Sequence, residues 1–215
     1  DHAARYLPTL VDHDISGPAD FMMNAAEIDL VDRYQRLTDR LRHAESHYGR
    51  VEGSVCLVAV SKTYPADHIR TVAAQGQRDF GENQIQDAMT KIPVLTDPSC
   101  SWHFIGPIQS NKCRDIALHF DWVHSVDRAK IARRLCDLRP AGTKPINIFI
   151  QLNLQNEATK SGVLPEELGA LVDEVRNLPN LRLRGLMAIP APETLFDRQR
   201  TTFARLRELL QATNR

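Results

Sequence analysis

Short apolar runs and helix-like stretches alternate along this chain, and this alternation limits the possible folds more than any other feature. Six apolar runs occur, at residues 55–60, 78–81, 101–105, 121–126, 146–152 and 181–189. Helix-like stretches follow them, at residues 66–75, 84–92, 111–118, 128–138, 165–178 and 195–212. Strands and helices in strict alternation predict an α/β protein with a parallel sheet, either doubly wound or closed as a barrel.

The first apolar run is followed by Ser61 and Lys62. An unbroken run rich in β-branched residues is typical of a strand buried on both faces of a sheet. A lysine at the carboxyl end of such a strand stands where the ligand crevices of α/β folds begin. Partial desolvation would favour its neutral amine, which can attack a carbonyl group to form a Schiff base. A solvated lysine in a turn is the alternative, and the run alone does not decide between the two.

The overall charge and the cysteines exclude several classes of protein. The sequence has 27 basic and 27 acidic residues and no block dense in lysine and arginine, which argues against nucleic-acid and membrane-surface partners. None of its apolar runs is long enough to cross a bilayer. The cysteines are scattered without a CxxC pair, at Cys56, Cys100, Cys113 and Cys136. They predict reduced thiols in a cytoplasmic protein.

The first regular helix is predicted to begin near Asn24. Residues 1–24 show no sustained period, and we interpret them as an extension of unknown origin. Asn24 and Glu27 resemble a capping box, and apolar residues then recur every three or four positions up to Tyr48, before Gly49. Residues 25–215 are therefore predicted to form one domain, a barrel preceded by a helix.

Polar residues gather where the predicted strands end. They are Ser61-Lys62, Glu82-Asn83, Gly106-Pro107 with Gln109-Ser110-Asn111, Ser125, Asn153 and the segment 188–190. In an α/β barrel these ends meet on one rim, the face that carries active sites. The sequence therefore predicts one polar rim around Lys62.

Two residues of this set allow two interpretations each. His103 lies inside the third apolar run, so it is either a hydrogen-bonded core histidine or a ligand contact. Ser110 is placed to cap a helix that starts near Asn111, and such helix starts also bind phosphate.

Motifs for metal and nucleotide binding are not supported. His43 and His47 have a spacing that suits two ligands on one helix face, but Glu45 stands two residues after the first histidine rather than directly after it. The segment around Lys62 lacks the glycines of a phosphate-binding loop. We predict neither a metal site nor a nucleotide site.

Five motifs occur together in a fixed order. They are Val-Ala-Val-Ser-Lys-Thr (58–63), Phe-Gly-Glu-Asn (80–83), Trp-His-Phe-Ile-Gly-Pro-Ile-Gln-Ser-Asn-Lys (102–112), Lys-Ser-Gly (160–162) and Leu-Arg-Gly-Leu-Met-Ala-Ile-Pro (183–190). In this combination the sequence, from about Asn24 onward, resembles the pyridoxal-phosphate homeostasis proteins. The single domain of that family is similar to the N-terminal barrel of alanine racemase.

The resemblance implies a barrel that binds pyridoxal 5′-phosphate (PLP), with Lys62 forming a Schiff base. It also implies that Asn83 and the strand of His103 line the cofactor pocket, and the strand-end residues Ser110 and Asn153 complete our candidate set. Family members are regarded as carriers or regulators of PLP in the cell, so we expect no catalytic residues and no turnover. PLP-dependent apoenzymes are the partners that a carrier implies, and the family leads us to expect a monomer.

One departure from the family concerns the end of the sequence. The family continues into a Ser-Met-Gly-Met-Ser-like segment and an Arg-Ile-Gly strand, whereas this sequence ends at Arg215 after its sixth strand–helix unit. We therefore expect the last two β/α units, and with them much of the phosphate site, to be missing. The edges of an unclosed barrel would favour self-association.

Two other functions remain open at this point. The alanine-racemase-like barrel is compatible with a PLP-dependent amino-acid racemase or lyase, although a racemase needs a second acid–base group opposite the cofactor. The expected lack of the phosphate segment is compatible with a scaffold that does not bind the cofactor.

Overall fold

The computed structural model describes residues 24–95, 97–157 and 160–214. Their centre is a six-stranded sheet in which every strand runs parallel to its neighbours, in the order β1-β2-β3-β4-β5-β6. The strands are β1 (Ala59–Val60), β2 (Asp79–Glu82), β3 (Ser101–Phe104), β4 (Trp122–Val126), β5 (Ile146–Leu152) and β6 (Leu181–Ala188). Because the spatial order of the strands follows the chain, each crossover leads to the adjacent strand.

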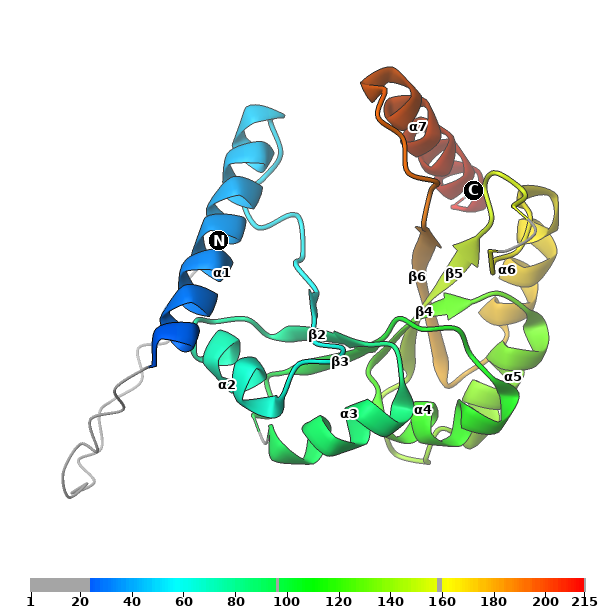
Figure 1. Cartoon of the computed structure of the whole chain (residues 1–215). Coiled ribbons are helices and arrows are strands. Elements are labelled where there is room, and N and C mark those ends of the chain that lie inside the picture. Colours follow the sequence, from blue (N-terminus) through cyan, green and yellow to red (C-terminus); the bar gives the residue numbers. More distant parts are fainter. Residues whose placement is uncertain (1–23, 96, 158–159, 215) are drawn as a thin grey trace, which may run out of the picture.

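Helices cover the convex side of this curved sheet (Figure 1). They are α2 (Ala66–Ala74), α3 (Ile85–Lys91), α4 (Cys113–His119), α5 (Ala129–Leu138) and α6 (Leu168–Arg176). A doubly wound sheet would carry helices on both faces, whereas here they lie outside a concave inner face. The predicted α/β fold of the barrel type is confirmed, with six strands in the described residues.

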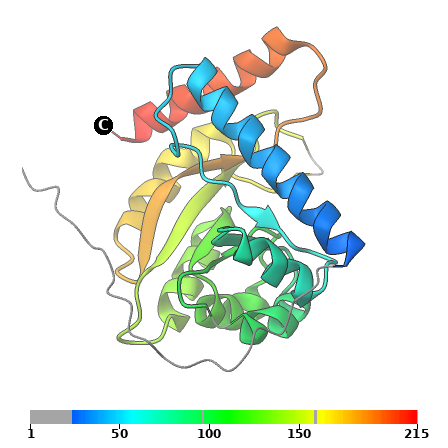
Figure 2. The ribbon, with the colours of Figure 1, turned by 90° about the vertical axis from the view of Figure 1, so that its left-hand side faces the viewer.

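The long helices α1 (Ala25–His47) and α7 (Phe196–Thr213) lie at the two ends of the curved sheet (Figures 1 and 2). The predicted capping box of α1 is present: the Asn24 side chain accepts from the Glu27 N–H, and the Glu27 carboxylate accepts from the Asn24 N–H. Gly49, at φ 64°, follows the helix end as predicted. The extension predicted at residues 1–24 lies outside the described residues except for Asn24, the N-cap of α1.

The prediction for the first apolar run, a strand buried on both faces, is wrong. Only Ala59 and Val60 form β1, Val60 is 44% exposed, and Cys56 is exposed. In the described part of the chain β1 pairs with β2 alone, so one edge of β1 has no strand partner there. A run of apolar residues becomes a doubly buried strand only where other elements cover it on both sides.

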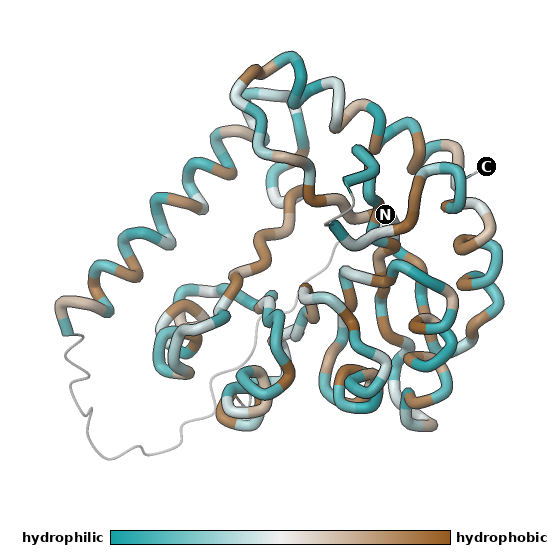
Figure 3. The backbone as a smooth tube through the Cα atoms, turned by 45° about the vertical axis from the view of Figure 1, so that its right-hand side comes forward, coloured by the Kyte–Doolittle hydropathy of each residue, from teal (hydrophilic) through white to brown (hydrophobic). Residues whose placement is uncertain are grey.

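The hydrophobic core lies between the sheet and its outer helices. Ile146, Ile148 and Ile150 of β5 are fully buried on the convex side, whereas Asn147 and Phe149 between them are only half-buried on the concave side. Hydrophobic residues predominate along β5, whereas hydrophobic and hydrophilic residues alternate along the helices (Figure 3). The apolar core therefore lies on the convex side, and polar side chains are found at the strand ends and on the concave side.

Short 3-10 turns precede or follow three of the helices. They are η1 (Ile92–Val94), η2 (Ser110–Lys112) and η3 (Pro165–Glu167). The predicted helix at residues 165–178 thus begins as a 3-10 turn with proline in first position, which needs no N–H there. In the described ranges we find no helix that is long and apolar enough to cross a membrane.

Candidate functional site

The turns that follow β1 to β4 lie together at one rim of the sheet. Ser61 Oγ donates to Glu82 Oε1 at 2.6 Å, which links the ends of β1 and β2. A Cβ atom on Gly106 would collide with the carbonyl oxygen of Asn83, so glycine is needed where the turns after β2 and β3 meet. Ser125 Oγ donates to the Gly106 carbonyl. The predicted gathering of polar strand ends is therefore confirmed for these four strands.

Lys62 lies in the turn that follows β1, closed by a hydrogen bond from the Tyr64 N–H to the Ser61 carbonyl at 3.1 Å. Lys62 is exposed, because the turn stands at the rim, past the end of the strand. Ser61 points to the helix side of the sheet, and Lys62 follows it in the turn beyond the end of β1. A primary amine in this position is accessible to a small carbonyl compound.

A buried group of charges adjoins this turn on the helix side of the sheet. Lys91 of α3 is 2% exposed, and Glu82 at the end of β2 is 0% exposed. The Lys91 ammonium donates to Glu82 Oε1 at 2.8 Å, to Asp87 Oδ2 at 2.7 Å and to the Ser61 carbonyl at 2.7 Å. We refer to Ser61, Glu82, Asp87 and Lys91 as the Lys91 cluster.

Hydrogen bonds within the Lys91 cluster shift the pKa values of Lys91 and Asp87 toward their charged forms. Burial alone would lower the pKa of Lys91, but hydrogen bonds to Asp87 and Glu82 outweigh it and raise the pKa. Burial would raise the pKa of Asp87, but hydrogen bonds from Lys91 and from the Thr63 N–H outweigh it and lower the pKa. Lys91 and Asp87 therefore form a mutually stabilised ion pair beside the buried Glu82, whose Oε2 has no hydrogen-bond partner among the described residues.

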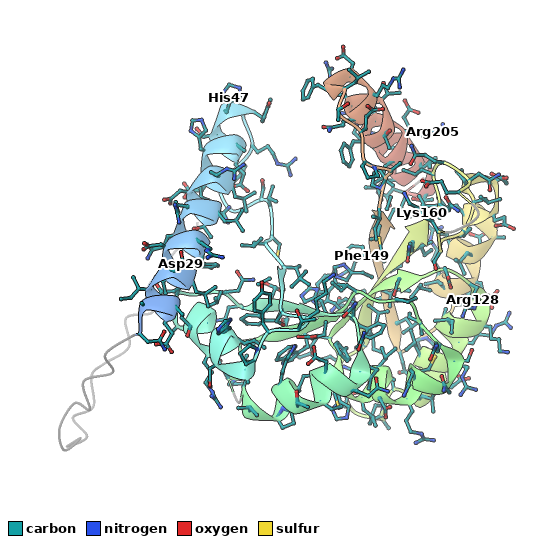
Figure 4. All side chains as sticks on the ribbon, viewed as in Figure 1. Asp29, His47, Arg128, Phe149, Lys160 and Arg205 are labelled. Atoms are coloured by element: carbon teal, nitrogen blue, oxygen red, sulfur yellow. The ribbon has the colours of Figure 1, made fainter. Side chains whose placement is uncertain are left out.

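A second polar network lies on the concave side of the sheet. His103 of β3 contacts Asp79 of β2 through Nε2 and His124 of β4 through Nδ1, each at 2.9 Å. The His103 ring is stacked on Trp122, with 5.4 Å between ring centroids, and Trp122 is stacked in turn on Phe149. Phe149 lies on the same concave side (Figure 4). We refer to Asp79, His103 and His124 as the Asp79–His124 chain.

Both histidines of the Asp79–His124 chain are neutral near pH 7. Burial lowers the pKa of His103 more than the Asp79 carboxylate raises it, and burial together with His103 lowers the pKa of His124 to about 4. Neutral His103 therefore donates from Nε2 to Asp79, and its Nδ1 accepts from His124 Nε2. Both ring nitrogens of His103 have partners within the protein, which matches its interpretation as a core histidine. Its contact with a cofactor stays a prediction.

The other three candidate residues differ in how far contacts within the protein already occupy their side chains. Asn83 is half-buried at the rim, between β2 and α3. The prediction that Ser110 is an N-cap is wrong. Ser110 is the first residue of η2, and the N-cap is Gln109, because the chain turns one residue earlier than expected. The Asn153 side chain is occupied: its Nδ2 donates to the Glu157 and Lys160 carbonyls, and its Oδ1 accepts from the Glu157 N–H. Asn153 therefore shapes its own loop.

Sequence reasoning missed Asp87, Lys91, Asp79 and His124. Asp87 and Lys91 are four residues apart on one helix, a spacing that predicts an ion pair but is usually solvated. Asp79 and His103 come from adjacent strands, and the concave side that they share follows from strand pairing alone. These residues become visible as a site only when the sheet register is known.

Comparisons with known proteins place the chain in a family. Residues 33–215 match the family described as "Alanine racemase, N-terminal domain". A pyridoxal phosphate homeostasis protein of Pseudomonas aeruginosa is 54% identical over 185 residues, which cover 86% of this chain and 80% of that protein.

Solved structures agree with this placement. PipY from Synechococcus elongatus, in a structure described as having PLP bound, is 37% identical, with a TM-score of 0.70 and coverage of 82% of this chain and 81% of that one. An alanine racemase from Corynebacterium glutamicum shares the fold alone, at 15% identity and a TM-score of 0.61, over 86% of this chain and 51% of that one. The five ordered motifs, the six-stranded barrel-type sheet and these matches agree, and the chain belongs to the pyridoxal phosphate homeostasis protein family.

Proposed function

We propose that this chain binds PLP through a Schiff base on Lys62 and takes part in intracellular PLP homeostasis as a carrier or regulator. The observation that carries the proposal is the exposed Lys62 in the turn at the carboxyl end of β1 in a barrel-type sheet. The names of the Pseudomonas aeruginosa and Synechococcus elongatus relatives support the same cofactor.

The residues at the rim fit the aldehyde end of this cofactor. When bound, PLP supplies an aldehyde carbon with which a primary amine condenses. Lys62 provides that amine, and a C=N bond would form while the aldehyde oxygen leaves as water. Asn83 is half-buried at the same rim and is the next candidate contact. Of the predicted set, Ser110 and Asn153 gain the least support, because Ser110 does not cap a helix and Asn153 is occupied by its own loop.

The exposure of Lys62 supports a carrier more than an enzyme. An accessible lysine can be replaced on the aldehyde carbon by an incoming amine, which frees Lys62 and passes the cofactor on. Racemases and lyases need in addition an acid–base group aimed at the substrate. His103, the histidine of the candidate set, uses both ring nitrogens within the protein. PLP-dependent apoenzymes are the recipients that we propose.

Reductive trapping tests the proposal. The protein is incubated with PLP, reduced with borohydride and digested, and the modified residue is located by mass spectrometry. We expect the label on Lys62 and its loss in Lys62→Ala. Lys130→Ala is the control, since Lys130 is an exposed lysine on α5.

Two results would count against this function. Equal labelling of Lys62→Ala and the unmodified protein would remove Lys62 from the site. Turnover of D- or L-amino acids that is abolished by Lys62→Ala would show that the chain is an enzyme and not only a carrier.

A further inference from the structure

We propose that the Lys91 cluster is a positioning device for Lys62, in which Lys91 and Asp87 hold the two chain neighbours of that lysine in place. This inference rests on the proposed function, since it concerns how the PLP-binding amine is presented. Lys91 and Asp87 are positioning residues here, because they act through the turn after β1.

The contacts on either side of Lys62 carry the argument. On one side, the Lys91 ammonium donates to the Ser61 carbonyl at 2.7 Å, and Ser61 Oγ donates to Glu82 Oε1 at 2.6 Å. On the other side, the Thr63 N–H donates to Asp87 Oδ2 at 3.2 Å. The residue before Lys62 and the residue after it are thus both fixed by side chains of β2 and α3.

The backbone of the turn shows why such support is needed. Thr63 has φ 68°, in the left-handed region that β-branched residues rarely adopt. Strained conformations of this kind persist only where surrounding contacts hold them. The Asp87 carboxylate accepts from the N–H of this same residue, so it stabilises the conformation that follows Lys62.

Burial makes the cluster rigid. Lys91 and Glu82 are almost completely buried, whereas most exposed ion pairs hold no fixed geometry. Lys91 reaches three acceptors at once, so its ammonium has no spare donor with which to form an alternative arrangement. An exposed, flexible lysine on an otherwise unsupported turn would spread over many orientations, and the cost of ordering it on binding would lower the affinity for a carbonyl ligand.

Asp87→Ala is the main test, because the Asp87 side chain is 32% exposed and its removal leaves Lys91 paired with Glu82. Two quantities are measured. Hydrogen exchange of the Thr63 amide reports the turn without any cofactor, and absorbance titration with PLP reports formation of the Schiff base. We expect faster exchange at Thr63 and a fall in PLP affinity of about tenfold or more, with a loss of folding stability smaller than that of Lys91→Met, because Lys91 keeps Glu82 as a partner.

Two further variants keep the test decisive. Asp87→Asn retains an oxygen that accepts from the Thr63 N–H, so it should restore most of the affinity that Asp87→Ala loses. Arg33→Met is the matched control, since it removes an exposed i,i+4 pair with Asp29 on α1, far in sequence from the turn. It should change neither readout.

The outcomes separate this inference from the proposed function. Faster Thr63 exchange with unchanged PLP affinity would overturn the positioning role while the PLP function stands. Unchanged Thr63 exchange in Asp87→Ala would overturn it as well. Full PLP binding by Lys62→Ala would reject the proposed function itself, and with it the role of the cluster in presenting Lys62.

Discussion

The two polar networks on the two sides of β2 solve the same problem, the burial of polar groups, in opposite ways. On the helix side, Glu82 belongs to the Lys91 cluster, where Lys91 and Asp87 stay charged. On the concave side, Asp79 meets histidines whose burial keeps them neutral. Asp79 and Glu82 are only three residues apart, and strand alternation alone sends them to different surroundings.

The difference teaches where each network is vulnerable. A buried ion pair is costly to break, because the remaining charge has neither water nor a partner. A chain of neutral rings tolerates loss of one member better but is sensitive to protonation. We therefore expect mutations to damage the Lys91 cluster most and mild acid to damage the Asp79–His124 chain most.

The largest effect is expected from Lys91→Met. This change leaves the Glu82 carboxylate buried without its cation, and we expect a loss of about 3–5 kcal/mol in the free energy of unfolding, measured by urea denaturation. Lys130→Met, at an exposed position on α5, should stay within about 0.5 kcal/mol of the unmodified protein. A loss below about 1 kcal/mol for Lys91→Met would show that the cluster carries no buried charge.

Mild acid should reveal the other network. The pKa values of His103 and His124 are lowered by folding, that of His124 to about 4, so the unfolded chain binds more protons as the pH falls below about 6.5. Stability is therefore full above about pH 6.5 and decreases as the pH falls toward 4. Urea midpoints at pH 7.5 and pH 5 measure this decrease.

His124→Gln identifies the source of this acid sensitivity. Its amide can still donate to His103 Nδ1 but does not titrate, so the pH slope should become shallower. Asp87 should not contribute in this range, because its lowered pKa keeps its stabilisation present above about pH 3.8. An unchanged slope in His124→Gln would assign the acid sensitivity to other groups.

Ser61→Ala should have a smaller effect. It removes one hydrogen bond to Glu82 while Lys91 remains paired, and we expect a loss of about 1 kcal/mol by urea denaturation. If this loss equalled that of Lys91→Met, neutral hydrogen bonding rather than charge would dominate the cluster.

The smallest effect is expected at the exposed Asp29–Arg33 pair on α1. Arg33→Met should change the free energy of unfolding by less than about 0.5 kcal/mol, because exposed pairs are well solvated and screened. Comparison with Lys91→Met then measures how much burial changes the energy of an acid–base pair at the same i,i+4 spacing. Equal effects of the two changes would contradict the comparison.

Much of the fold could be predicted because it depends on local pattern. The alternation of apolar runs and helix-like stretches predicts the order of strands and helices, and the capping box at Asn24 and Glu27 is present as expected. The predictions of the fold were wrong where the burial of a segment depends on other segments that are distant in the sequence. The run at 55–60 reads like residues 146–152, but only the second run has a paired strand on each side.

The candidate site was predictable only in part. Lys62 and Asn83 lie at the predicted rim, and their position follows from the ends of apolar runs. Asp87 and Lys91 look like an ordinary surface pair in the sequence, yet Lys91 is buried against β2. The Asn153 side chain is used within its own loop, which no spacing of residues predicted.

The sequence by itself determined the parallel α/β sheet, the family and the lysine at the end of the first strand, because periodicity, turn residues and ordered motifs are written along the chain. Only the tertiary structure decided that Lys62 is exposed, that Ser61 and Thr63 are tied to α3, and that Asp79 and Glu82 face different networks. The physical reason is that solvation, charge and hydrogen bonding depend on which atoms meet in space, and sheet register brings together residues that are distant in the chain.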